Sequence, residues 1–406
     1  MAKFAIKIHR NGNYTRAWLN YMCKVYGLKM TDEKEADIIL LSLSDPTEIN
    51  LLFEAKRSQK PIILGGCEAF HEKMYSNLAD LINVGEGFEI FEKLQTIKDK
   101  SPGKIIEKLK DLPYIYYKGK EGNIYPSTKI NWDLVPIVKT GVRRRIILGG
   151  RGCRKKCKFC YTSWTTKYQN NPYLPSIDKQ VMIITNDNLG PKQLYQRAYV
   201  RSITAEGYLK MTEAQAKTCY YYRIGLESFS EKTRKFYGKP ISGEQIRKIM
   251  EMSREFNHRL TLFIIAGYEP QESVEEFCNC FQQDTKYKNP KIEVKITYLE
   301  PTLHTPLQDF DIRKMYHWEK NYLIGRLTYA SQRFRIWSMK RDYGNAYWRT
   351  CLHRARTREE IEEIYRWKGK TGKEILELIR QKGWLHLYNQ NNSTNIRFWY
   401  KGIDDK

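Results

Sequence analysis

Short apolar runs alternate with amphipathic stretches over the first part of the chain. The apolar runs cover residues 4–8, 36–42, 61–64 and 81–84, and the amphipathic stretches cover 14–26 and 48–58. Strands that alternate with helices of about 10–15 residues are typical of a parallel, doubly wound sheet. Residues 1–95 are therefore predicted to form a Rossmann-like domain that binds ligands at the carboxyl ends of its strands.

A second alternating series follows a connector at 96–144, which contains Pro102-Gly103 and a hairpin-like stretch at 115–125. Its strand-like runs are 145–148, 181–185, 202–205, 221–224, 260–265 and 293–298, with clear helical patterns at 242–256 and 273–283. Six such units predict a partial (β/α)6 TIM-like barrel over 145–307, with chemistry at the carboxyl ends of its strands.

The last region, 308–406, is rich in Trp, Tyr, Arg and Lys. Capping-box spacings at Thr357 and Glu360, and at Thr371 and Glu374, predict short helices. We expect a mainly helical, basic C-terminal extension of an otherwise α/β protein.

Charge and composition narrow the class of protein. Lys and Arg outnumber Asp and Glu by 70 to 46, a net charge of +24 that attracts polyanions, nucleic acid first. The alternative is a lysine-rich surface without such a partner. The sequence has no apolar run of about 18 residues and no secretory signal at residues 1–8. We therefore expect a cytoplasmic protein without membrane contact.

Three of the nine cysteines lie together, at Cys153, Cys157 and Cys160, directly after the first strand of the second series. Three thiolates in one loop can each bind a different iron of a cubane cluster and leave the fourth iron open. Neighbouring cations are expected to lower the thiol pKa values. The alternative is zinc completed by a distant His, although zinc sites more often use paired C-x-x-C units.

With Phe159 before its last cysteine and Tyr161 after it, this loop resembles the signature of the radical S-adenosylmethionine (SAM) superfamily. The resemblance covers about 145–307 and continues through segments 182–188, 222–228, 263–270 and 301–306. It implies a 4Fe–4S cluster on the three cysteines and SAM chelated to the open iron. Reductive cleavage would then yield a 5′-deoxyadenosyl radical that abstracts hydrogen from a substrate.

The same resemblance implies further roles, and an electron donor such as flavodoxin or ferredoxin. Tyr161 and Gly267 would flank adenine. Asp187, Glu227 and Ser228 would hydrogen-bond the SAM ribose or amino group. The residues alone allow another interpretation, in which Glu227 and Ser228 cap the next helix and Asp187 forms an Asx-turn. No side chain is nominated as a catalytic acid, base or radical donor.

Residues 1–95 also resemble the cobalamin-binding-type domain that precedes many radical SAM cores. The similarity lies in segments 36–40, 61–66 and 79–87, followed by a linker-like segment at 132–136. The Asp-x-His-x-x-Gly loop that supplies an axial histidine is missing, since 9–13 reads His-Arg-Asn-Gly-Asn. Either cobalamin binds without a protein ligand to cobalt, or the domain is only a scaffold. A methylthiotransferase is disfavoured, because this region has only Cys23 and Cys67.

Cations and aromatic rings interleave late in the chain, which suits phosphates and stacked bases. The residues are Arg326, Arg333, Phe334, Arg335, Trp337, Lys340, Arg341, Tyr343, Tyr347, Trp348 and Arg349. The alternative makes these rings the core of a helical extension. The leading hypothesis is a radical SAM enzyme that modifies a nucleobase in DNA or RNA. The others are a radical SAM enzyme acting on a peptide or small metabolite, including cobalamin-dependent methyl transfer, and a non-catalytic nucleic-acid-binding metal protein. The oligomeric state cannot be read from the sequence.

Overall fold

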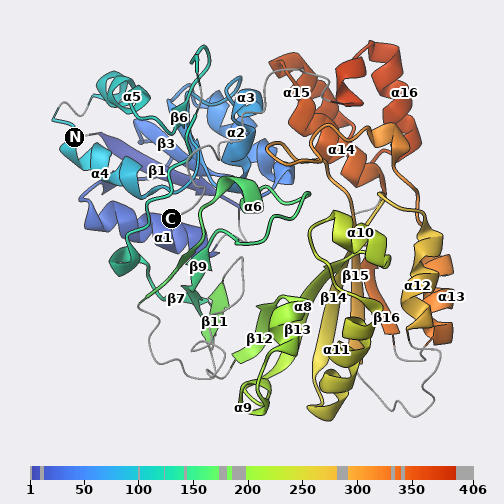
Figure 1. Ribbon diagram of the computed structural model, residues 1–406. Coiled ribbons are helices and arrows are strands. Elements are labelled where there is room, and N and C mark those ends of the chain that lie inside the picture. The colour runs from blue at the N-terminus through green and yellow to red at the C-terminus, as the bar shows by residue number, and fades with distance from the viewer. Residues whose placement is uncertain are drawn as a thin grey trace.

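The computed structural model describes three regions arranged around a shared core (Figure 1). The described residues are 2–9, 13–98, 101–122, 124–140, 144–172, 181–184, 198–280, 291–330, 334–339 and 343–389. In the part of the chain so described, no helix is long and apolar enough to cross a membrane.

The N-terminal region is the predicted doubly wound sheet. Its six strands run in the order β2-β1-β3-β4-β5-β6, parallel except for the antiparallel pair β5–β6. The strands are β1 (Lys3–Ile8), β2 (Lys29–Met30), β3 (Ile38–Ser42), β4 (Ile62–Gly65), β5 (Leu81–Asn83) and β6 (Ile115–Tyr116). All five residues of β3 are buried, as expected for a central parallel strand covered on both faces. The helices are α1 (Asn13–Val25), α2 (Ile49–Arg57), α3 (Glu72–Tyr75), α4 (Phe88–Thr96) and α5 (Pro102–Lys110).

The hairpin predicted at 115–125 does not form. Ile115 and Tyr116 instead pair with Asn83 and Ile82 at the edge of the N-terminal sheet. A turn closed by the Lys120 N–H to the Tyr117 carbonyl follows them. Pairing with an existing sheet satisfies more backbone groups than an isolated two-stranded hairpin, which is marginal in water.

The barrel region carries the six predicted strands as β8 (Arg144–Leu148), β11 (Val181–Ile184), β12 (Ala198–Ile203), β13 (Cys219–Glu227), β14 (Arg259–Ala266) and β15 (Lys291–Tyr298). β8 pairs with β11, and β12 to β15 pair in sequence, all in parallel. The helices beside them are α8 (Ala205–Leu209), α9 (Glu213–Ala216), α10 (Glu231–Phe236), α11 (Gly243–Glu255), α12 (Val274–Asn279) and α13 (Lys320–Ala330).

The strands of this region form two sheets, β11-β8-β7 and β12-β13-β14-β15-β16, and each contains one strand that was not predicted. β7 (Val138–Thr140) pairs antiparallel with β8, and β16 (Phe334–Met339) extends the sheet in parallel beyond β15. β16 comes from the region expected to be mainly helical. A strand here occupies the edge of β15, whose N–H and C=O groups would otherwise lack partners.

The C-terminal helices are α14 (Tyr343–Arg354), α15 (Arg358–Arg366) and α16 (Gly372–Lys382), and α15 lies beside α2, where Phe53 contacts Tyr365 (Figure 1). The Thr371 capping box forms as predicted. Thr357 caps the N–H of Glu360, but the Glu360 carboxylate accepts from the Arg356 N–H. Trp348 and Trp367 are fully buried in a core shared with the other two regions. These helices therefore bridge the N-terminal sheet and the barrel.

Candidate functional site

The cysteine loop leaves the carboxyl end of β8 and is held by a small antiparallel pair. β9 (Gly150–Arg151) pairs with β10 (Gln169–Asn170), and α6 (Thr162–Thr165) lies between them. Gly152 has φ +68°, and a Cβ there would lie 2.3 Å from the Lys167 carbonyl oxygen. Only glycine fits this position without moving the backbone. The backbone directly before Cys153 is thus held in one conformation.

The three thiols share this compact loop. Cys157 is buried, and Cys153 and Cys160 are half-buried. The Cys160 N–H donates to the Cys157 carbonyl at 3.1 Å, and the Lys155 N–H donates to Cys153 Sγ at 3.4 Å. The three sulfurs do not all lie within 4.8 Å of one another, whereas two thiolates on one tetrahedral zinc lie about 3.8 Å apart. The three thiols are thus not placed for one zinc ion in this arrangement of the loop.

The expected lowering of the thiol pKa values is wrong for Cys157. Burial raises the pKa of this thiol to about 12, and the nearby Lys239 ammonium lowers it only in part. Two cations of the loop have partners of their own. Lys155 pairs with Glu206, and the ammonium of Lys158 lies 3.9 Å from the Phe236 ring centroid. Deprotonation of Cys157 therefore depends on metal coordination.

Glu227 lies at the carboxyl end of β13, close to Cys157. It has φ +67°, and the β13–β14 register shifts between Gly225 and Glu227. Its Oε1 lies 2.5 Å from Lys239 Nζ in a largely buried ion pair. The structure thus brings Glu227, Lys239 and the cysteine loop together.

Ser228 and Gly267 also lie at this edge of the barrel. The fully buried Ser228 hydroxyl donates to Glu269 Oε1 at 2.6 Å and accepts from the Ser230 N–H at 2.9 Å. Gly267 follows β14 with φ +99°, and a Cβ there would lie 3.2 Å from Met315 Cε. The bond from the Ser230 N–H to Ser228 forms a local turn before α10 and is not a helix cap, since the N-cap of α10 is Ser230 itself. The SAM contacts of Glu227, Ser228 and Gly267 remain predictions, and Asp187 lies outside the described residues.

Tyr161 faces the N-terminal sheet. Its ring centroid lies 5.3 Å from that of Phe70, and its hydroxyl interacts with Cys67. Burial and this neighbouring thiol raise the pKa of Tyr161 well above its ordinary value. Arg151 makes a second link, with Nε 2.7 Å from Glu86 Oε1. The cysteine loop is therefore docked on the strand ends of the Rossmann-like region.

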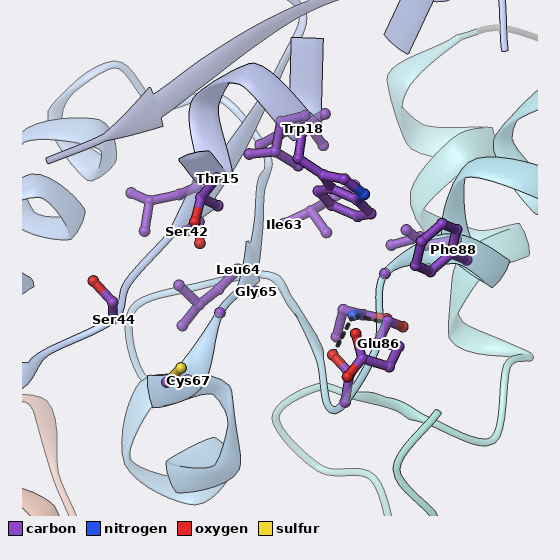
Figure 2. A pocket seen from close by; sticks show the side chains of 18 of the residues that line it. Thr15, Trp18, Ser42, Ser44, Ile63, Leu64, Gly65, Cys67, Glu86 and Phe88 are labelled. Atoms are coloured by element: carbon purple, nitrogen blue, oxygen red, sulfur yellow. Dashed lines mark hydrogen bonds between the residues drawn. The ribbon is translucent and has the colours of Figure 1, made fainter. Parts of the chain in front are cut away.

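A cavity of about 450 Å³ lies at this junction, between the strand ends of the N-terminal sheet and the cysteine loop (Figure 2). Its wall is apolar around Trp18 and Phe88, whose rings meet edge to face at 5.3 Å. Hydroxyls of Thr15, Ser42 and Ser44 add polar positions. The wall from the second region consists of Leu148, Arg151, Tyr161, Thr162 and Thr166. Residues of the N-terminal region and of the cysteine loop thus line the same cavity.

Sequence reasoning missed several residues of this site. Arg151 and Glu86 join the two regions, Cys67 contacts Tyr161, and Lys239 and Glu269 hold Glu227 and Ser228. Glu86 carried a signal, since it lies between two glycines after a predicted strand. Nothing in the sequence marks Lys239, which reaches Glu227 only through the turn after α10.

No family model and no curated protein matches this sequence. Solved structures match in fold. The radical SAM methyltransferase TsrM from Kitasatospora setae, with cobalamin and a 4Fe–4S cluster bound, matches with TM-score 0.58 and 11% identity over 94% of this chain and 100% of that one. The same enzyme with tryptophan substrate and aza-SAM matches with TM-score 0.53, 12% identity and the same coverage.

The cobalamin-dependent SAM radical enzyme OxsB, with aqua-cobalamin and SAM bound, matches with TM-score 0.52 and 16% identity over 70% of this chain and 52% of that one. The chain thus spans about half the length of OxsB and the full length of TsrM. It has the fold of cobalamin-dependent radical SAM enzymes, which confirms the predicted architecture.

Proposed function

We propose that this protein is a cobalamin-dependent radical SAM enzyme that methylates a peptide or a small metabolite. The observation that carries the proposal is the shared cavity, which joins the strand ends of the Rossmann-like region to the cysteine loop. Two cofactors bound on opposite walls of one cavity would meet the same substrate. The fold neighbours TsrM and OxsB support this assignment.

The residues present fit a 4Fe–4S cluster. Cys153, Cys157 and Cys160 would hold three irons, one thiolate to each iron. When bound, the cluster supplies the electron that cleaves SAM, delivered by a donor such as flavodoxin or ferredoxin. The chain's own contribution is to bury Cys157 and to hold the Glu227–Lys239 pair beside it.

The residues also fit cobalamin bound without an axial protein histidine. The cavity wall around Trp18 and Phe88 is apolar and other lining residues carry hydroxyls, which suits a bulky macrocycle with polar substituents. A Cβ at Gly65 would meet no atom within 4 Å, so the β4 end leaves open space. When bound, cobalamin supplies the methyl carrier.

A nucleobase substrate has less support. It rested on the interleaved cations and rings of the C-terminal region. Tyr347 and Trp348 are fully buried, and Arg349 is 6% exposed, so these residues form core and not a stacking surface. Nucleic-acid binding therefore stays a prediction from the net charge alone.

Binding of hydroxocobalamin by the full chain tests the cavity. Gly65→Leu fills the open space at the end of β4, and we expect its dissociation constant to rise tenfold or more. Gly103→Leu, in the exposed first turn of α5 where a Cβ also meets nothing, is the matched control and should bind as the parent does. Equal affinity in all three proteins, or no binding by the parent, would contradict the proposal.

Turnover tests the reaction. The anaerobically reconstituted protein, with a reductant and cobalamin, should consume SAM and transfer its methyl group to members of a peptide or metabolite library. Nucleic acid is added in a parallel series. SAM consumption that requires nucleic acid would restore the nucleobase hypothesis. SAM consumption that is the same with and without cobalamin would contradict a role for cobalamin as methyl carrier.

A further inference from the structure

Three buried polar side chains meet where the Rossmann-like region contacts the C-terminal helices. Glu68 and His71 belong to the short 3-10 helix Cys67–His71 after β4, and His353 lies in the last turn of α14. Their carboxylate and imidazole ligand atoms lie within 4.8 Å of one another. Throughout the described ranges, this is the group of three His, Cys, Asp or Glu side chains that satisfies this spacing. Residues far apart in sequence thus bring two imidazoles and a carboxylate into one buried cluster.

Hydrogen bonding leaves two ring nitrogens of this group without a partner. The Tyr75 hydroxyl donates to Glu68 Oε2 at 2.9 Å, and His353 Nε2 lies 3.1 Å from the same oxygen. The Nδ1 atoms of His71 and His353 are buried and make no hydrogen bond. The two residues are 3% and 6% exposed, and a buried polar atom left unpaired destabilises the folded protein.

Another buried histidine of this chain has hydrogen-bond partners for both of its ring nitrogens. His258 is 3% exposed, like His71. Its Nδ1 lies 2.7 Å from the Tyr208 hydroxyl and its Nε2 lies 3.0 Å from the Ala216 carbonyl oxygen. The unpaired nitrogens of the His71–His353 pair are therefore a local feature and not a general consequence of burial.

The charges around the group favour a cation. The neighbouring carboxylates are Asp45, Glu68, Glu72 and Glu300, and the neighbouring guanidiniums are Arg349 and Arg354. Arg349 pairs with Asp45 and Glu300, and Glu68 and Glu72 add two further buried carboxylates beside the imidazoles.

We propose that Glu68, His71 and His353 bind one divalent transition-metal ion, zinc in preference to iron. Two imidazoles and a carboxylate are a known zinc donor set, and such donors bind zinc more tightly than ferrous iron. Tyr75 would orient the carboxylate through its hydrogen bond to Glu68. The ion would fasten α14 to the Rossmann-like region behind Phe70, which lines the cavity.

Ligation requires one imidazole to rotate. The rings of His71 and His353 are stacked, with centroids 3.6 Å apart and planes 6° from parallel. An ion between stacked rings would lie outside both ring planes, where the nitrogen lone pairs do not point. Rotation of one ring about its Cβ–Cγ bond turns its lone pair toward Glu68, and this torsion is broad for histidine.

Metal content of the purified full chain tests the proposal. We expect about one zinc per chain in the parent protein after dialysis against zinc and then zinc-free buffer. His71→Gln and His353→Gln should each retain at least tenfold less zinc, while iron on the cysteine loop is unchanged. His258→Gln is the matched control, a buried histidine with both nitrogens bonded, and should retain the parent's zinc.

A second variant separates this site from the cysteine loop. Cys153→Ala/Cys157→Ala/Cys160→Ala removes the thiols and should still retain one zinc, or bind one Co²⁺ with a visible d–d absorption band. This variant also decides the matter if the histidine variants do not fold. Zinc lost with the cysteines, zinc equal in all histidine variants, or no zinc above background in the parent would each overturn the metal site without bearing on the proposed enzyme function.

Discussion

The N-terminal sheet and the barrel both end their parallel strands at the junction, yet the two edges differ in character. At the N-terminal edge, the space beyond β3, β4 and β5 is a cavity with apolar walls of Trp18 and Phe88. At the barrel edge, the space beyond β13 is filled by the Glu227–Lys239 ion pair beside the buried Cys157.

This difference shows that strand topology supplies a place for a site, while side chains decide what the place can hold. The hollow edge suits a bulky ligand held mainly by contact area. The charged edge suits a compact, charged group held by a few strong interactions. The charge that the N-terminal edge keeps at its cavity, Glu86, is paired with Arg151, while Asp45 pairs with Arg349 of α14.

Removing a thiol of the cysteine loop should have the largest effect on the function of the barrel edge. Cys157→Ala is expected to abolish SAM cleavage and to lower bound iron severalfold, because one cluster iron loses its ligand. Cys219→Ala, a buried cysteine in β13 away from the loop, is the control. Iron analysis and SAM consumption measure both effects. Full cleavage by the Cys157 variant would show that the loop does not hold the catalytic cluster.

Neutralising Lys239 should destabilise the same edge strongly. Lys239→Met leaves the Glu227 carboxylate largely buried without its cation, and breaking such a pair costs about 3–5 kcal/mol. Lys239→Met/Glu227→Gln removes both charges and should recover much of that loss. Denaturant unfolding of the single and double variants gives the coupling. Equal losses in both would mean that the ion pair contributes little.

Adding a methyl group at Gly152 should distort the cysteine loop and so lower both iron binding and the stability of the fold. Gly152→Ala must adopt φ +68° and displace the Lys167 carbonyl, and the left-handed backbone alone costs roughly 1–2 kcal/mol. We expect lower iron occupancy together with a lower midpoint of thermal unfolding. Gly103→Ala, in the exposed first turn of α5 with open space at its Cβ, should leave both unchanged or raise the midpoint. Unchanged iron in the Gly152 variant would indicate a loop that tolerates movement.

The same contrast explains what the sequence could predict. Apolar runs such as β3 and the spacing of the three cysteines are local, so they identified the sheet, most of the barrel and the cluster loop. Lys239, Arg151 and the Glu68–His71–His353 group depend on contacts between distant segments, which no local pattern records. The buried Trp348 and Arg349 were misleading for the same reason, because their composition alone resembles a nucleic-acid surface.

The last prediction concerns Asp45, which pairs with Arg349 of α14, and its contribution to the free energy of unfolding. Asp45 is partly desolvated, which raises its pKa, but Arg349 and the Thr47 donors outweigh this and lower it from 3.8 to about 2. Because the folded pKa lies below the unfolded one, the carboxylate stabilises the protein above about pH 4. This contribution, about 2 kcal/mol, is lost as the pH falls from 4 toward 2.

Asp45→Asn should therefore lower the free energy of unfolding at pH 7 by about that amount, with a difference from the parent that shrinks toward pH 2. Urea unfolding at several pH values measures it. Asp133→Asn, an exposed aspartate in the short 3-10 helix Trp132–Leu134, is the control and should follow the parent at every pH. A difference at Asp45 that stays constant with pH would mean that the lost interaction is a hydrogen bond and not the ion pair with Arg349, leaving the N-terminal edge without an electrostatic tie to α14.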